Sequence, residues 1–130
     1  MRLAVVSFIV LSLAGVAHAA ERTLSIEAEL MGPKDKSLGK TQVLVAARAT
    51  DRGRGVFGDL TLVLDVDVGP TFDKDCNLVT VTGRLEEAVP EGKPKRRDLK
   101  RTSVQACGPS TQATLAAGTN SVVITVRPAP

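Results

Sequence analysis

The sequence predicts an all-β protein built as a single small antiparallel β-sandwich. Several stretches alternate apolar and polar residues with a period of two, which is typical of a half-buried strand because successive side chains point to opposite faces. Clusters of glycine and proline separate these stretches and indicate turns. No stretch shows the periodicity of an amphipathic helix, so the pattern favours short strands joined by turns.

The expected strands are 23–30, 41–50, 59–69, 77–87 and 120–126, with 101–107 and 111–117 as short candidates. A helix within Leu99–Ala106 is the alternative for the first of these candidates. The clearest is 23–30, TLSIEAEL, in which every second residue is apolar. The residues expected to face the core are Leu24, Ile26, Ala28, Leu30, Val43, Val45, Ala47, Ala49, Leu60, Leu62, Leu64, Val66, Val68, Val79, Val81, Leu85, Val122, Ile124 and Val126.

The intervening segments carry the residues that turns require. They include Gly32-Pro33, Asp51–Gly55, Gly69-Pro70, the Pro90–Pro94 stretch, Gly108-Pro109 and Gly118. A small closed β-barrel is the alternative architecture. The expected sandwich is immunoglobulin-like in general shape, but the cysteine–tryptophan–cysteine signature of that fold is absent because the chain has no tryptophan.

Three regions are expected along the chain. Residues 1–19 read as a secretory signal peptide, with Arg2, an apolar run and a small-residue cleavage site that predicts a cut after Ala19 or Ala20. Residues 21–127 then form the β domain, and 128–130 form a short tail. No later apolar stretch approaches the length of a membrane-spanning helix, so we expect a periplasmic or secreted protein without a transmembrane segment.

Cys76 and Cys107 are the two cysteines of the chain. Pairing is the default in an oxidising compartment, so we expect a disulfide between them. They lie 31 positions apart. In the chain-entropy model, closing such a loop stabilises the fold by about 3–4 kcal/mol.

Missing residue types limit the chemistry that the protein can perform. The only histidine is His18, inside the expected signal peptide, so the exported chain cannot build a catalytic triad that uses histidine. Aromatic platforms for a sugar cleft are also scarce, since Phe57 and Phe72 are the aromatic residues after the signal and both are expected in the core. We therefore expect no enzymatic activity, no catalytic residues and no cofactor.

An acidic stretch from Asp65 to Asn77 contains clustered oxygen ligands of the kind that calcium prefers. The spacing departs from the EF-hand pattern, because Leu78 replaces the turn glycine and Arg84 replaces the bidentate glutamate. The favoured interpretation is a solvated strand face followed by a turn. A calcium site is the weaker hypothesis, with candidate ligands Asp65, Asp67, Asp73, Asp75 and Asn77.

The most unusual stretch is GKPKRRDLKR, residues 92–101, which we call the basic segment and expect to form a loop. Its six basic residues against Asp98 give it a net charge of +5, while the chain without Arg2 carries about +2. Such a concentration of charge attracts anions. The candidate partner-binding residues are Lys93, Lys95, Arg96, Arg97, Lys100 and Arg101.

We expect a non-catalytic binding module whose basic segment contacts an envelope lipid, a glycan or an acidic protein. Nucleic acid is not expected, because the stacking aromatics of single-strand binders are missing. A solvated hairpin loop that guards a sheet edge is the simpler interpretation of the same charges, and a protease-sensitive linker is another. Two other functions are considered. One is an assembly protein pairing through the strand edges TQVLVAARA and NSVVITV, and the other is a hydrolase inhibitor presenting a loop.

Overall fold

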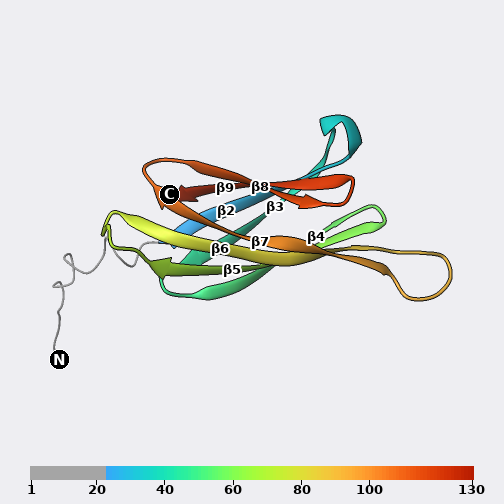
Figure 1. The fold of residues 1–130 in the computed structure, drawn as a ribbon, viewed down its shortest axis with the longest axis horizontal. Helices are drawn as coiled ribbons and strands as arrows, with labels where there is room; N and C mark the ends of the chain where they lie inside the picture. Colours follow the sequence, from blue (N-terminus) through green and yellow to red (C-terminus); the bar gives the residue numbers. More distant parts are fainter. Residues whose placement is uncertain (1–22) are drawn as a thin grey trace, which may run out of the picture.

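The computed structural model describes residues 23–130, and the expected signal peptide with its cleavage site lies outside the described residues. Two antiparallel four-stranded sheets pack face to face and leave free edges, so the predicted β-sandwich is confirmed and the closed barrel is wrong (Figure 1). The elements are β2 (Thr23–Met31), a 3₁₀ turn η3 (Pro33–Asp35), β3 (Ser37–Ala46), β4 (Thr50–Phe57), β5 (Leu60–Pro70), β6 (Cys76–Glu87), β7 (Lys95–Cys107), β8 (Thr111–Ala117) and β9 (Asn120–Pro128).

One sheet has the strand order β3-β2-β9-β8, and the other has the order β4-β5-β6-β7. The second sheet is a meander of consecutive hairpins. The first combines an N-terminal hairpin with a C-terminal hairpin, joined where β2 pairs with β9 from Leu24 opposite Pro128 to Met31 opposite Ser121. Past the end of β9, the backbone N–H of Ala129 still donates to the carbonyl of Thr23 at 3.0 Å.

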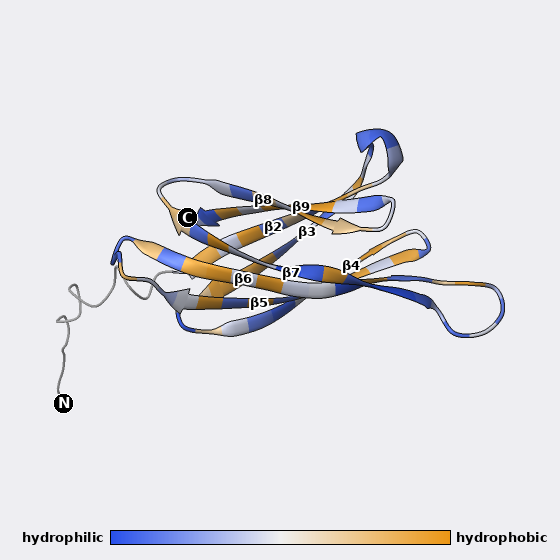
Figure 2. Cartoon of the chain, viewed as in Figure 1, coloured by the Kyte–Doolittle hydropathy of each residue, from blue (hydrophilic) through white to orange (hydrophobic). Residues whose placement is uncertain are grey.

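The core lies between the two sheets and consists of the alternating apolar residues of their inner faces (Figure 2). Most residues expected to face the core are buried, including all four of β2. Ala47, Ala49 and Leu60 are half-buried instead. The buried apolar residues are Leu24, Ile26, Ala28, Leu30, Val43, Val45, Leu62, Val63, Leu64, Val66, Val68, Cys76, Val79, Val81, Leu85, Leu99, Ala106, Leu115, Ala117, Val122, Ile124 and Val126.

Strand β4 corrects the sequence interpretation, which took Asp51–Gly55 as a turn and ran the preceding strand through Thr50. The chain instead turns after Ala46, where Arg48 adopts a φ of 62°, and Thr50–Phe57 pairs with β5 along its whole length. Gly53 is buried at the inner face, where a Cβ atom would overlap Cγ2 of Val43 on β3. Glycine is needed here because the two sheets approach closely.

The ring of Phe57 explains a second glycine of the same strand. A Cβ atom added to Gly55 would lie only 2.7 Å from Cζ of Phe57. The same ring also covers Gly39 of β3. Phe57 packs against the core, as expected. Phe72 does not, because it stands at the loop after β5 with a relative exposure of 110%. Among the described residues, no helix is long and apolar enough to span a membrane.

Candidate functional site

The basic segment is part of a strand and not a loop over most of its length. Only residues up to Pro94 belong to the connection between β6 and β7, while Lys95 and all later residues of the segment lie in β7. This correction matters because β7 is the last strand of its sheet. The six basic side chains of the segment are all exposed. The one buried residue of the segment is Leu99, which is 6% exposed.

Strands β6 and β7 form a long hairpin whose connecting loop projects beyond the rest of the sandwich (Figure 1). The first half of β7 forms the strongly hydrophilic part of this arm (Figure 2). The pairing opposes Arg96 to Glu86 and Arg97 to Leu85. It shifts between Val81 and Gly83, where β7 accommodates an additional residue. The bulge leaves Lys100 and Arg101 exposed in succession.

Alternation along β7 divides the basic side chains between two faces of the sheet. Lys95 and Arg97 lie on the side that looks toward the other sheet, where they border a small cleft with Asn120 of β9. Arg96 lies on the outer face with Arg84 and Asp98. The charges therefore surround the edge of the sheet on both sides.

Arg97 differs from the other basic residues because its side chain packs over the β8–β9 turn. Its Nη1 and Cζ would lie 2.5 Å and 3.1 Å from a Cβ atom on Gly118, which has a φ of 67°. Glycine fits this position for two reasons, since the conformation is left-handed and the guanidinium occupies the space above it. Arg97 thus connects the two sheets and has a structural role.

The outer face of the β4-β5-β6-β7 sheet carries charges of both signs. Arg52 Nε lies 2.8 Å from Asp65 Oδ1, and Arg84 Nε lies 2.9 Å from Glu86 Oε2. Arg101 borders a shallow hollow together with Asp65 and Asp67. The acids on this face therefore lie next to basic residues of several strands.

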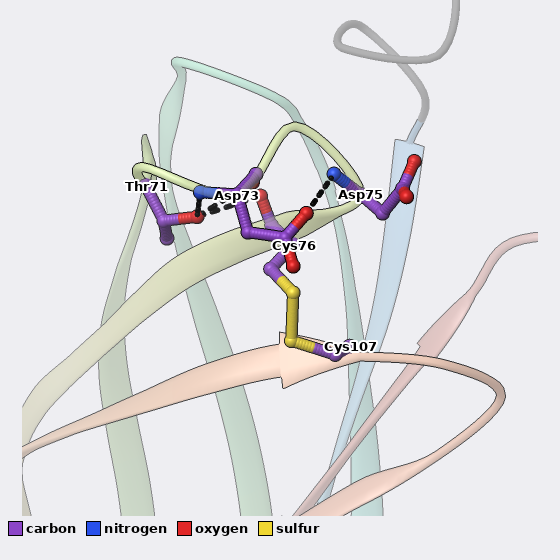
Figure 3. Close-up of a disulfide and its surroundings, with 5 residues drawn as sticks. All are labelled: Thr71, Asp73, Asp75, Cys76 and Cys107. Carbon is purple, nitrogen blue, oxygen red and sulfur yellow. Dashed lines mark hydrogen bonds between the residues drawn. A yellow bond between two sulfur atoms is a disulfide. The ribbon is translucent and has the colours of Figure 1, made fainter.

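The calcium candidates occupy different environments. Asp65 accepts from Arg52, and Asp67 accepts a 2.8 Å hydrogen bond from the hydroxyl of Thr50. Asp73 accepts a 2.9 Å hydrogen bond from the backbone N–H of Asp75 in the turn before β6 (Figure 3). Asn77 is buried. In the described part of the chain, no three His, Cys, Asp or Glu side chains are grouped closely enough to hold a metal ion.

The predicted disulfide between Cys76 and Cys107 is confirmed (Figure 3). The two residues are directly opposed in the β6–β7 register with a Cα–Cα distance of 4.5 Å, so the bond crosses between neighbouring strands. It joins the start of β6 to the end of β7, at the end of the hairpin opposite its projecting loop. The basic edge is consequently the distal part of a covalently anchored arm.

One surface feature was missed by sequence reasoning. Pro70, Thr71, Phe72, Leu78 and Gln105 line an open, mainly apolar groove of about 510 Å³ beside the disulfide. Leu78 is 40% exposed and faces outward from β6. A signal for this groove exists in the sequence, since Phe72 follows Gly69-Pro70 and therefore stands outside the alternating pattern of β5.

The assembly hypothesis named two segments that could serve as exposed strand edges, and the strand order supports this role for one of them. Strand β3, which contains most of TQVLVAARA, is an edge strand, and Leu44 on it is 54% exposed. Strand β9, which contains NSVVITV, lies between β2 and β8 and is not an edge. Comparison with known proteins gave no matching family model, no similar curated sequence and no similar solved structure.

Proposed function

We propose that the protein is an exported, non-catalytic interaction module that contacts an anionic partner through the basic edge of β7. The observation that carries this proposal is the fixed row of exposed basic side chains on a projecting hairpin. A strand holds its side chains at regular spacing, about 7 Å between neighbours on the same face. The charges are therefore pre-arranged for a partner, which reduces the ordering that binding requires.

Within the residues that the structure describes, most of the basic side chains of this segment form no ion pair, and this also supports the proposal. Among residues 23–130, four ion pairs form, and only the one between Arg96 and Asp98, at 3.0 Å, includes a residue of the basic segment. The other five basic side chains are exposed and have no carboxylate within ion-pair distance in that range. Exposed, unneutralised charge is what steers an anionic partner toward a surface.

Export and the absence of catalysis rest on the sequence. The first 19 residues have the composition of a signal peptide, and the disulfide fits an oxidising compartment. The chain after Ala20 has no histidine, so the exported protein cannot form a catalytic site that relies on histidine.

The experiment is retention of the oxidised protein on a sulfated polysaccharide column during a salt gradient. The test variant keeps Arg97 because of its contact with Gly118. It replaces the other five basic residues by serine, which are Lys93, Lys95, Arg96, Lys100 and Arg101. We expect the wild type to elute at much higher salt, because salt screens attraction between exposed charges.

A control variant separates local from overall charge. The control, called the turn variant, removes three exposed basic residues from turns elsewhere on the molecule: Lys36→Ser, Arg48→Ser and Lys74→Ser. The matched edge variant removes three exposed basic residues from β7: Lys95→Ser, Arg96→Ser and Lys100→Ser. The proposal predicts a clear loss of retention for the edge variant and little loss for the turn variant. Equal losses for the two variants would contradict it.

A further inference from the structure

The free edge of β7 offers backbone groups as well as charge. The residues Lys95–Leu99 pair with β6 on one side, and within the described part of the chain no backbone hydrogen bond links their other side to another strand. Unpaired N–H and C=O groups along an edge strand are a template for one more strand. Recognition by strand addition uses such an edge for affinity and the side chains for specificity.

The position of the charges favours an extended polypeptide over a membrane or another flat surface. Lys95 and Arg97 lie on the inner side of the edge, whereas Arg96 lies on the outer side. A flat anionic surface can reach only one of these sides at a time. An extended peptide beside β7 projects its side chains alternately to both sides, with the same repeat of about 7 Å on each.

The same charges disfavour a second copy of this chain as the added strand. Pairing two β7 edges would place their basic residues beside one another, and like charges across neighbouring strands are destabilising. A segment rich in glutamate or aspartate would instead place carboxylates beside Lys95, Arg96 and Arg97. The bulge between Val81 and Gly83 interrupts the regular ladder beyond Leu99, so the regular part of the edge is about as long as an average short strand.

We infer that the edge of β7 at Lys95–Leu99 binds an extended, acidic segment of another polypeptide as an additional strand. The inference rests on the proposed function, since it names the class of anionic partner. It adds a requirement that charge attraction alone does not impose: the backbone amides of the partner must be free to donate hydrogen bonds.

The experiment uses the oxidised protein and two fluorescent peptides of equal charge. One is an octapeptide of two Glu-Glu-Thr-Thr repeats, which places glutamate on both sides of an extended chain. Its twin carries an N-methyl group on every central amide. Fluorescence anisotropy gives the affinities, and hydrogen exchange of the protein amides gives the location. Direct binding of vesicles containing phosphatidylglycerol is measured by co-sedimentation, and direct binding of soluble heparin is measured by isothermal titration calorimetry.

The inference predicts that N-methylation weakens peptide binding at least tenfold. The unmethylated peptide should also slow amide exchange within Lys95–Leu99. The variant Lys95→Ser, Arg96→Ser, Lys100→Ser should lose at least tenfold in affinity for it, while the turn variant Lys36→Ser, Arg48→Ser, Lys74→Ser stays within threefold of the wild type.

Three other results would overturn the inference in distinguishable ways. Equal binding of both peptides would leave contact with an anion but remove strand addition. Binding of vesicles or heparin without binding of either peptide would assign the edge to a lipid or a glycan, and the proposed function would stand. Failure of all four probes, with unchanged column behaviour of the edge variant, would remove both the inference and the proposed function.

Discussion

The two lateral sides of the sandwich bring edge strands of opposite sheets together in different ways. On one side, β3 lies beside β4, and the contact is made by Val43 over Gly53 and by the ring of Phe57 over Gly55. The hydroxyl of Thr41 also donates to the carbonyl of Arg54 at 3.3 Å. On the other side, β8 accompanies β7, and a short corner after Cys107 and the side chain of Arg97 connect the sheets.

The difference shows two solutions to the same problem, which is that an unpaired edge invites unwanted pairing. The β3–β4 side covers its inner edge with apolar contacts that require glycine. The β7–β8 side keeps a long strand exposed and covers it with positive charge. The first solution closes the surface with apolar contacts, whereas the second leaves an exposed, positively charged edge, which is the surface that we propose binds an acidic chain.

The largest expected effect concerns the covalent anchor of the β7 side. Replacing Cys76 and Cys107 together by serine should lower the free energy of unfolding by about 3–4 kcal/mol, because the denatured chain is no longer cross-linked. Urea denaturation under oxidising conditions measures this. Reducing agent should have the same effect on the wild type and none on the double variant. A loss below about 1 kcal/mol would show that the strands hold this side without the bond.

The next effect probes the apolar side. Gly53→Ala should destabilise the protein by about 1–3 kcal/mol, because the added methyl group overlaps Val43 and forces the sheets apart. Val43→Ala in the same chain should recover part of the loss, giving a coupling energy between the two positions. Gly69→Ala is the control, since a Cβ atom there would meet nothing closer than 4.0 Å. Purely additive effects of the two changes would contradict the close approach.

A smaller effect separates two neighbouring arginines of β7. Arg97→Ser should destabilise the fold by about 0.5–1 kcal/mol, because the stem of Arg97 covers the Gly118 turn. Arg96→Ser removes only an exposed ion pair with Asp98, and exposed pairs contribute little. Thermal unfolding of both variants at the same salt concentration checks the order. Equal melting temperatures would assign Arg97 to the surface charge alone.

The smallest effect on stability accompanies a change in association. Lys95→Thr, Arg96→Thr and Lys100→Thr together should change the unfolding free energy by no more than about 0.5 kcal/mol, as surface substitutions usually do. The variant should nevertheless associate with itself more strongly than the wild type, because an uncharged edge is free to pair. Sedimentation across a concentration series detects this. Monomeric behaviour of the variant at all concentrations would show that the charges do not guard the edge.

The strands with clear alternation could be predicted from the sequence, and β2 and β5 lie where expected. Strand β4 could not, because Gly53 and Gly55 replace the apolar residues of its inner face and resemble turn residues. Its pattern of arginine and glycine does alternate with a period of two. The small residues mark the close approach of β3, which depends on a contact between distant parts of the chain.

The candidate site was predicted in composition but not in geometry. The positive charge of the basic segment is visible in the sequence, but the start of β7 at Lys95 within this segment is not, because an edge strand exposed on both faces has no apolar alternation. Whether a strand lies at an edge depends on the order of pairing. Here β7 is an edge because the next strand, β8, belongs to the other sheet and pairs there with β9, which local sequence does not encode.

The pairing of β2 with β9 also affects the order in which the two sheets can fold. The β4-β5-β6-β7 meander is built from neighbouring hairpins, so it can form as soon as its own residues are available. The other sheet can be completed only with the last strand, because Ile26 is opposite Val126 and the amide of Asn120 donates to the carbonyl of Met31. Contacts between distant residues slow folding. We therefore expect part of the inner face of the meander, which includes Leu62 and Val81, to stay uncovered until the last strand completes the other sheet.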